Sequence, residues 1–431
     1  MTKRRSASRP ATARRHRRPS FVALVLLLAV AAPAAAQYRD AGEGLELLPN
    51  RKEQLEKALD DAPWTFGKLR VAPWIGLRNV NYVRELDAQG REQEGDLTAT
   101  AGAGLRAYLK LGTHAIAAAH AIPEYSWWQK QDDRNARVGR YGLGLFGWFN
   151  RVEGEVTTRR IEEVRFLSSD VLVHEPTRND VLNASAQVRV LGSIAVFGSA
   201  SADRTRIEAT SGLTPNDPAE LLDRDGTVVR GGLRYLLRGR RGYVGAGVLS
   251  ERTEFQGAAD ATRSNEGSSW YTELQLEGNH LTVGVQYDQH DLEGDDSTFP
   301  GYEAAGGRAT VLLHPGWRIQ YQLYGSRQLR YSALAAGSFI EEERAGAGAH
   351  VTLGKGGLQL FYESGSDDYF GSTTRQDDVT AMGAWIDLPV RRLNLRVGGR
   401  QTEFETAGGA KREVREVLGT LSLAFGGPGD W

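Results

Sequence analysis

One stretch of the chain combines the residue types of a hydrolase. Ser168, Ser169 and Asp170 precede His174, and a serine nucleophile needs a histidine base that a carboxylate orients. Such residues also occur by chance in polar loops. The sequence has no GxSxG, P-loop, zinc or dinucleotide-binding motif beside them. We therefore expect no catalytic residues and do not expect the protein to be an enzyme.

Paired carboxylates recur in the polar segments and raise the question of a metal site. They stand at Asp132-Asp133, Asp295-Asp296, Asp367-Asp368 and Asp377-Asp378. Hard cations such as Ca²⁺ favour clustered carboxylates, but none of these pairs has the spacing of a calcium loop. A solvated loop surface explains them better. Because the chain has no cysteine, thiolate zinc sites and cysteine nucleophiles are also excluded, and no metal site is expected.

The chain is predicted to consist mainly of strands, because polar and apolar residues alternate along many segments. These strands must position the polar residues named above. In residues 97–111 the odd positions are Leu or Ala, whereas the even positions include Thr98, Arg106 and Lys110. A period of two indicates strands with one apolar and one polar face. It is not the pattern of a helix or of a buried parallel strand.

Very short turns join every second pair of these segments, and longer connections rich in Asp and Gly join the others. The short links include Leu111-Gly112-Thr113 and Gly278-Asn279. Short turns at one end and long loops at the other are typical of a barrel that crosses an outer membrane. We predict an all-β, transmembrane up-and-down antiparallel β-barrel over residues 67–425, with about eighteen strands. Sixteen strands remain possible if the segments 152–166 and 177–191 are misread.

The start of the chain predicts export. Basic residues precede Phe21–Val30, an apolar run too short to anchor in a bilayer, and Ala34–Ala36 supplies a small-residue cleavage site. We therefore expect residues 1–36 to be a cleaved signal peptide and the mature protein to lie in the cell outer membrane. Removing this segment leaves a moderately acidic chain, which argues against nucleic acid as a partner.

Residues 37–66 are predicted to be a periplasmic N-terminal segment. Within it, residues 50–62 predict a short helix that Asn50 caps and that ends before Pro63. Leu55 and Leu59 share one face of this helix. Two interpretations stay open: a small plug or periplasmic contact, and a leader helix that packs against the barrel mouth.

Two other segments carry expectations about the barrel. The longest external connection, Ala209–Thr227, is expected to fold inward and narrow the lumen. The last strand, with alternating residues up to Phe425, resembles the C-terminal signal that the barrel-insertion machinery recognises in outer-membrane barrels. Residues 426–431 follow as a C-terminal tail.

If the apolar positions face lipid, the alternate positions face the lumen. Basic residues outnumber acidic ones in that set, which favours a weak preference for anions or polyhydroxylated solutes. The alternative is that Arg and Glu side chains join facing walls and fill a narrow lumen. The pore-lining candidates are Arg70, Arg78, Arg106, Lys110, Glu124, Arg140, Glu153, Glu155, Arg189, Arg230, Arg234, Glu273, Arg318, Arg344, Glu363, Arg396 and Arg400.

Over its whole mature length the chain resembles the outer-membrane β-barrel porins of Gram-negative bacteria. The stretch Leu69–Val83 (LRVAPWIGLRNVNYV) is similar to the first strand of β-barrel porins that are often encoded beside exopolysaccharide genes. Arg78, Asn79 and Asn81 stand where Asp-Asp-Asn is expected in that family. The resemblance implies passive or export-linked passage of polar solutes, with no cofactor and no catalytic residues.

Two functions from different classes are compatible with these observations. The first is a porin-like channel for small polar solutes. The second is a non-conducting or gated outer-membrane component of an envelope or exopolysaccharide export assembly. The partners expected are outer-membrane lipid, lipopolysaccharide, the barrel-insertion machinery during biogenesis and a small polar solute. Whether the barrel forms a homo-oligomer is left open.

Overall fold

The structure is a computed structural model. It describes residues 51–84, 94–208, 221–237, 241–257, 263–294, 301–316, 318–333, 338–371, 374–390, 393–409 and 411–424. The predicted signal peptide (1–36) and C-terminal tail (426–431) lie outside the described residues. So do residues 209–220 of the connection that was expected to fold inward.

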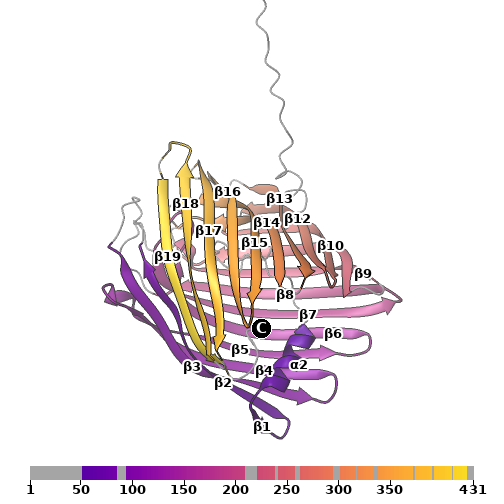
Figure 1. Ribbon diagram of the computed structural model, residues 1–431. Helices are drawn as coiled ribbons and strands as arrows, with labels where there is room; N and C mark the ends of the chain where they lie inside the picture. Colours follow the sequence, from indigo (N-terminus) through magenta and orange to yellow (C-terminus); the bar gives the residue numbers. More distant parts are fainter. Residues whose placement is uncertain are drawn as a thin grey trace, which may run out of the picture.

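The strands form one sheet that closes on itself (Figure 1). Each strand from β2 to β19 pairs with its sequence neighbour, and β19 pairs with β2. The predicted antiparallel barrel of eighteen strands is therefore confirmed. Closure satisfies the backbone hydrogen bonds of every strand, which is the condition for crossing lipid without helices.

The strands of the barrel wall have the following bounds: β2 Leu69–Val83, β3 Asp96–Leu111, β4 Ala115–Trp128, β5 Ala136–Trp148, β6 Val152–Phe166, β7 His174–Leu191, β8 Ile194–Ile207, β9 Arg224–Leu236, β10 Arg241–Phe255, β11 Asn265–Glu277, β12 Leu281–Gly294, β13 Tyr302–Gly316, β14 Ile319–Tyr331, β15 Ser338–Leu353, β16 Gly356–Gly371, β17 Arg375–Val390, β18 Leu393–Thr406 and β19 Lys411–Ala424. A short 3₁₀ helix, η1 (Asp132–Arg134), lies between β4 and β5.

An apolar belt covers the outer face of the barrel. Exposed Leu and Val side chains follow one another on neighbouring strands, as at Leu182, Val196, Leu233 and Val248. The alternate positions on the same strands carry the charged and polar residues. No helix within the described residues is long and apolar enough to span a membrane.

Two aromatic doublets near the loop end divide between the two faces of the wall. Trp127 is 41% exposed and Trp128 is 3% exposed, and the values for Trp270 and Tyr271 are 50% and 1%. Successive residues of a strand point to opposite faces. Only the first member of each doublet is therefore placed to meet lipid headgroups, and the second packs inside the barrel.

The helix α2 (Arg51–Asp61) lies inside the barrel at the end of the short turns (Figure 1). It packs on the inner faces of β3, β4 and β5. After Ala62 and Pro63, the strand β1 (Trp64–Phe66) pairs with the first residues of β2. The packed cluster consists of Leu55, Ala58, Leu59, Tyr108, Ile116, Ala118 and Phe146.

An arginine within the apolar belt is expected to destabilise the barrel. Leu233 is 58% exposed on the outer face of β9, and Thr227 lies on the same face closer to the loops. A charge near the bilayer midplane costs about 2–4 kcal/mol, against about 0–1 near the headgroups. We expect Leu233→Arg to lower the free energy of unfolding by about 2–4 kcal/mol and Thr227→Arg by less than about 1 kcal/mol, in urea titrations in lipid vesicles. Equal losses would contradict this orientation of the wall.

Candidate pore lumen

The pore-lining candidates within strands lie on the face opposite the apolar belt. Directly opposite residues of paired strands share a face, and Arg106 stands opposite His120 and Arg230 opposite Ser199. Arg318 lies in the turn that precedes β14. This position on the inner face does not by itself show that a solute touches these side chains, and their role in lining a pore stays a prediction.

A bulge in β2 changes which residues of that strand point inward. The pairing of β2 with β3 shifts between Arg78 and Asn81, and Asn79 has a φ of 50°. Asn tolerates this left-handed conformation better than most residues. As a result Asn81 faces inward and donates a hydrogen bond from Nδ2 to Oε1 of Glu416, over 3.1 Å. Simple alternation could not place Asn81 there, because the bulge adds one residue.

Many of the inward charges are already paired with each other. Arg78 donates two hydrogen bonds to the carboxylate of Glu124, at 2.8 and 2.6 Å, and Arg140 lies 3.6 Å from the same group. The partners stand on adjacent or next-but-one strands, so these pairs run along the wall rather than across the lumen. The other ion pairs between inward side chains are Arg234 with Glu273, Arg344 with Glu363 and Asp367, Arg396 with Asp387, and Arg400 with Glu416.

Arg234 is held by both polar and aromatic contacts. Its guanidinium binds both carboxylate oxygens of Glu273, at 2.7 and 3.1 Å, and donates to Gln187 at 3.1 Å. The rings of Phe197 and Tyr243 lie 3.9 and 4.1 Å from its guanidinium carbon. A bidentate pair between two aromatic rings leaves a guanidinium little freedom to bind a solute.

A cavity of about 970 Å³ opens between α2 and the strands β5 to β13. Its end nearest the turns carries Glu153, Arg189 and Glu277, and its deeper wall carries Arg230 and Arg308. Aromatic and amide side chains complete the wall, including Trp148, Phe197, Tyr243, Tyr271, Gln187, Gln275 and Gln286. Flat apolar faces beside hydrogen-bonding groups suit a small polar organic solute.

Arg230 and Arg308, like Arg189 nearer the turns, are unlike the cavity arginines Arg51 and Arg234, which have ion-pair partners. No carboxylate of the described residues lies within ion-pair distance of the Arg230 or Arg308 guanidinium, and Arg230 stands 6.0 Å above the ring of Tyr271. Both face the cavity. Arg308 was absent from the candidates, although the alternation of β13 (Arg308 and Thr310 against Ala309 and Val311) contained the signal. Arg230 and Arg308 are therefore placed on the deeper wall of the cavity, where they can meet an anionic solute.

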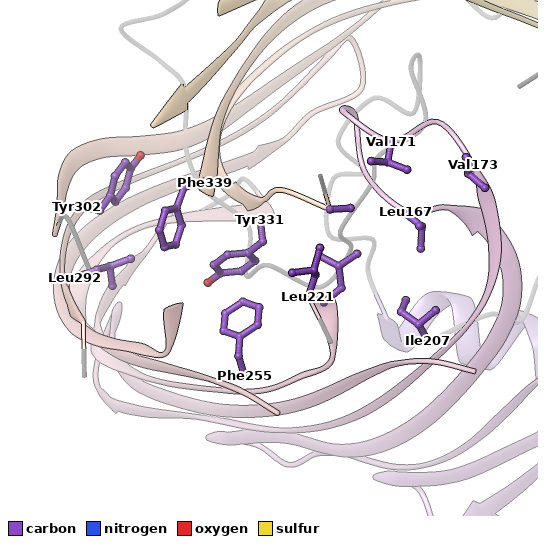
Figure 2. Packing of buried hydrophobic residues seen from close by; sticks show 12 residues of the cluster. Leu167, Val171, Val173, Ile207, Leu221, Phe255, Leu292, Tyr302, Tyr331 and Phe339 are labelled. Carbon is purple, nitrogen blue, oxygen red and sulfur yellow. The ribbon is translucent and has the colours of Figure 1, made fainter. Parts of the chain in front are cut away.

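Buried apolar side chains fill part of the lumen at the loop end. Figure 2 shows Leu221, Tyr331 and Phe255 at the centre of this cluster. The rings of Phe255 and Tyr331 meet edge to face at 4.9 Å. The other members come from strand ends and from three connections: Leu167, Val171, Val173, Ile207, Leu222, Leu292, Tyr302, Ala333 and Phe339. We call this set the loop-end cluster.

The connection between β6 and β7 crosses the inside of the barrel. Its Leu172 packs with Phe166 against Val379, Phe404 and Val414 of β17, β18 and β19, which lie on the far side of the ring. The connection that was expected to fold inward contributes Leu221 and Leu222 to the loop-end cluster. Sequence analysis missed the crossing of residues 167–173, although four of these seven loop residues are apolar.

Asp170 fastens this crossing segment to two places. Its carboxylate accepts hydrogen bonds from the hydroxyl groups of Ser168 and Ser332 and, at 3.3 Å, from the backbone N–H of Ala333. Its backbone carbonyl accepts from Arg412 of β19 at 3.0 Å. Asp170 therefore joins the β6–β7 connection to the β14–β15 connection and to β19, which is five strands from β6 around the ring.

Arg263 joins three connections in the same region. It donates to the backbone carbonyls of Leu221 and Ser332 and lies 4.7 Å from the ring of Phe255. Burial lowers the pKa of Arg263 to about 9. The side chain remains charged at neutral pH, and its carbonyl and ring contacts offset part of the cost of burial.

Two of the hydrolase candidates have defined contacts. The imidazole of His174 lies against Phe166, with the ring centroids 3.8 Å apart and the planes tilted by 39°, and Ser168 donates to Asp170. Elsewhere in the lumen, Ser269 and Glu251 both contact Nδ1 of His290, at 3.4 and 2.7 Å. An activated serine and its acid use opposite nitrogens of the ring, so this second trio lacks the required geometry.

Metal ligation finds no support within the described residues. No group of three or more His, Asp or Glu side chains is placed to hold an ion there. His280, His314 and His350 line a groove of about 350 Å³ beside the turns of β11 to β15, without converging on one point.

Comparison with known proteins identifies the fold. No family model and no curated protein matches the sequence. Among solved structures, the BenF-like porin from Pseudomonas fluorescens matches with a TM-score of 0.52 and 12% identity, over 84% of this chain and 100% of that one. OccK2 from Pseudomonas aeruginosa, in complex with glucuronate, matches with a TM-score of 0.49 and 12% identity, over 82% and 98%. The chain thus has the β-barrel fold with which porins cross the outer membrane.

Proposed function

We propose that the protein is a porin-like channel that admits small polar solutes through the outer membrane and weakly prefers anionic ones. The observation that carries the proposal is the cavity of about 970 Å³ inside a closed barrel, with Arg230 and Arg308 facing it. The porin fold supports the proposal that solutes pass through the barrel. The side chains that line the cavity support the preference for anionic solutes.

The preference for anions follows from how the cavity charges are compensated. Glu273 neutralises Arg234, and Arg51 of α2 lies 3.8 Å from Glu155. Arg230 and Arg308 have no carboxylate within ion-pair distance among the described residues, although the buried Asp288 interacts electrostatically with both. A guanidinium is a planar donor suited to carboxylates. Glu153 and Glu277 near the cavity mouth oppose this field, so we expect the preference to be weak.

The proposal assigns a role to each segment of the chain. Residues 1–36 direct export and are removed, residues 37–66 lie at the periplasmic end, and residues 67–425 form the barrel. Lipid and lipopolysaccharide contact the outer belt, and the insertion machinery acts on the unfolded barrel during biogenesis.

A second function is favoured by the loop-end cluster. A barrel whose loop end is partly filled by apolar side chains suits a gated or non-conducting component of an export assembly. On this alternative Asp170 and Arg263 hold the barrel shut until a partner displaces the loops.

Ion conductance of the refolded mature chain in a planar lipid bilayer separates the two. We expect stable, discrete current steps and a reversal potential in a KCl gradient that indicates a mild preference for chloride. The folded state is checked first by the heat-dependent shift of the barrel in gel electrophoresis. A folded barrel that passes no current would contradict the channel and favour the export component.

A further inference from the structure

We propose that α2 is a tethered gate at the turn end of the lumen, which opens when the helix leaves the inner face of β3, β4 and β5. The proposal rests on the proposed function as a channel. It adds a part of this chain that regulates the cavity beside Arg230 and Arg308.

The helix packs on the inner wall of the barrel and also lines the cavity. Leu55, Ala58 and Leu59 are 2%, 3% and 7% exposed and pack on the inner wall. Lys52 and Glu56, which flank this packed face at i,i+3 spacing from Leu55 and Leu59, line the cavity. Removing α2 would therefore widen the space that a solute enters, without disturbing any strand pairing.

An apolar contact and an ion pair help to hold the helix in place. Its apolar contact with the wall consists of two leucines and one alanine. The ion pair between Arg51 and Glu155 is 3.8 Å long, with both side chains 30% exposed, and exposed pairs of this kind stabilise little. Release of the helix would therefore break side-chain contacts but no strand pairing.

The helix depends on this contact for its own structure. An isolated helix of 11 residues is marginal in water. Its last turn contains Asp60 and Asp61 and no basic residue, which is unfavourable beside the negative end of a helix dipole. Leaving the wall is therefore coupled to loss of helical structure. Docked helix and released coil are two distinct states, as a gate requires.

A strand keeps the released segment close to its binding surface. Ala62 and Pro63 join α2 to β1, and β1 pairs with β2 through Trp64, Thr65 and Phe66. β19 ends opposite Trp74, so β1 occupies the part of the β2 edge that β19 does not reach. The short tether holds the helix at high effective concentration near the mouth, and closure is intramolecular.

A reversible covalent lock tests the gate. The chain has no cysteine, so Ala58→Cys combined with Ala118→Cys places the only two thiols in the same packed cluster, and loss of both free thiols on oxidation verifies the disulfide. We expect oxidation to lower the mean conductance about twofold or more and reductant to restore it, because the lock removes the open state. Each single-cysteine variant is the control.

Weakening the contact between α2 and the barrel wall should raise the mean conductance. We expect Leu55→Ser with Leu59→Ser to raise the mean conductance, and Gln54→Ser with Lys57→Ser, on the exposed face of the same helix, to leave it unchanged. A readout independent of current is labelling of Ala118→Cys by a water-soluble maleimide, since Ala118 is 2% exposed beneath the helix. The leucine variant should label about tenfold faster than the control.

The outcomes separate the gate from the channel. Equal labelling in both helix variants, together with equal conductance in oxidised and reduced protein, would overturn the gate and leave the channel standing. Faster labelling in a folded barrel that never conducts would overturn the channel and retain a releasable helix.

Discussion

Arg230→Glu combined with Arg308→Glu is expected to turn a weak preference for anions into a preference for cations. Both side chains face the cavity without an ion-pair partner among the described residues. A unit charge acting on an ion about 4 Å away through water contributes about 1 kcal/mol, which is about a fivefold change in partition for each site. Reversing two charges should therefore change the sign of the reversal potential in a KCl gradient.

The matched control places the same substitution on the outer face. Arg137 stands opposite Tyr125 on the outer side of β4 and β5, and Tyr125 is 48% exposed. Arg137→Glu changes the net charge as much as either single cavity substitution does, and it should leave the selectivity unchanged. The effect of the cavity variant should also shrink as KCl is raised, because salt screens the field. A selectivity that is unaffected by the cavity variant would place the conducting path elsewhere.

Asp170→Ala is expected to release the β6–β7 connection and raise the conductance. The substitution removes the acceptor of the Ser332 hydroxyl and of the Ala333 N–H. Each lost hydrogen bond to a charged group removes about 1.5–3 kcal/mol of stabilisation. The carbonyl of Asp170, which accepts from Arg412, then loses its fixed position. The crossing segment should move away from β17 to β19 and widen the loop end.

Two measurements check this second prediction. Single-channel recordings should show a larger and noisier current, and a protease added to the loop side should cut near residues 167–173 faster than in the unmodified protein. Asp170→Asn keeps one acceptor oxygen and should have an intermediate effect. Asp133→Ala, at an exposed position in another connection, is the control for a lost loop carboxylate. If Asp170→Ala neither changes the current nor exposes the segment, the connection does not constrict the lumen.

The barrel itself was predictable from local patterns. Alternation along residues 97–111 indicates a two-faced strand whatever the rest of the chain does, because the side-chain period of a strand is two. Short turns at one end require neighbouring strands to pair. The helix was also predicted within one residue at each end, from residues 50–62 to Arg51–Asp61, because its cap and the following Pro63 are local signals.

What the sequence determined by itself was therefore a closed wall and the set of residues on its inner face. Which of those charges remain free was decided by the tertiary structure: Arg234 is neutralised by Glu273, whereas Arg230 and Arg308 are not paired among the described residues. The same holds for the bulge at Asn79, the crossing segment at Asp170 and the docking of α2. Asp170 meets Ser332 and Arg412, which are far away along the chain. Periodicity contains no information about such contacts, because they depend on the register and curvature of the closed ring.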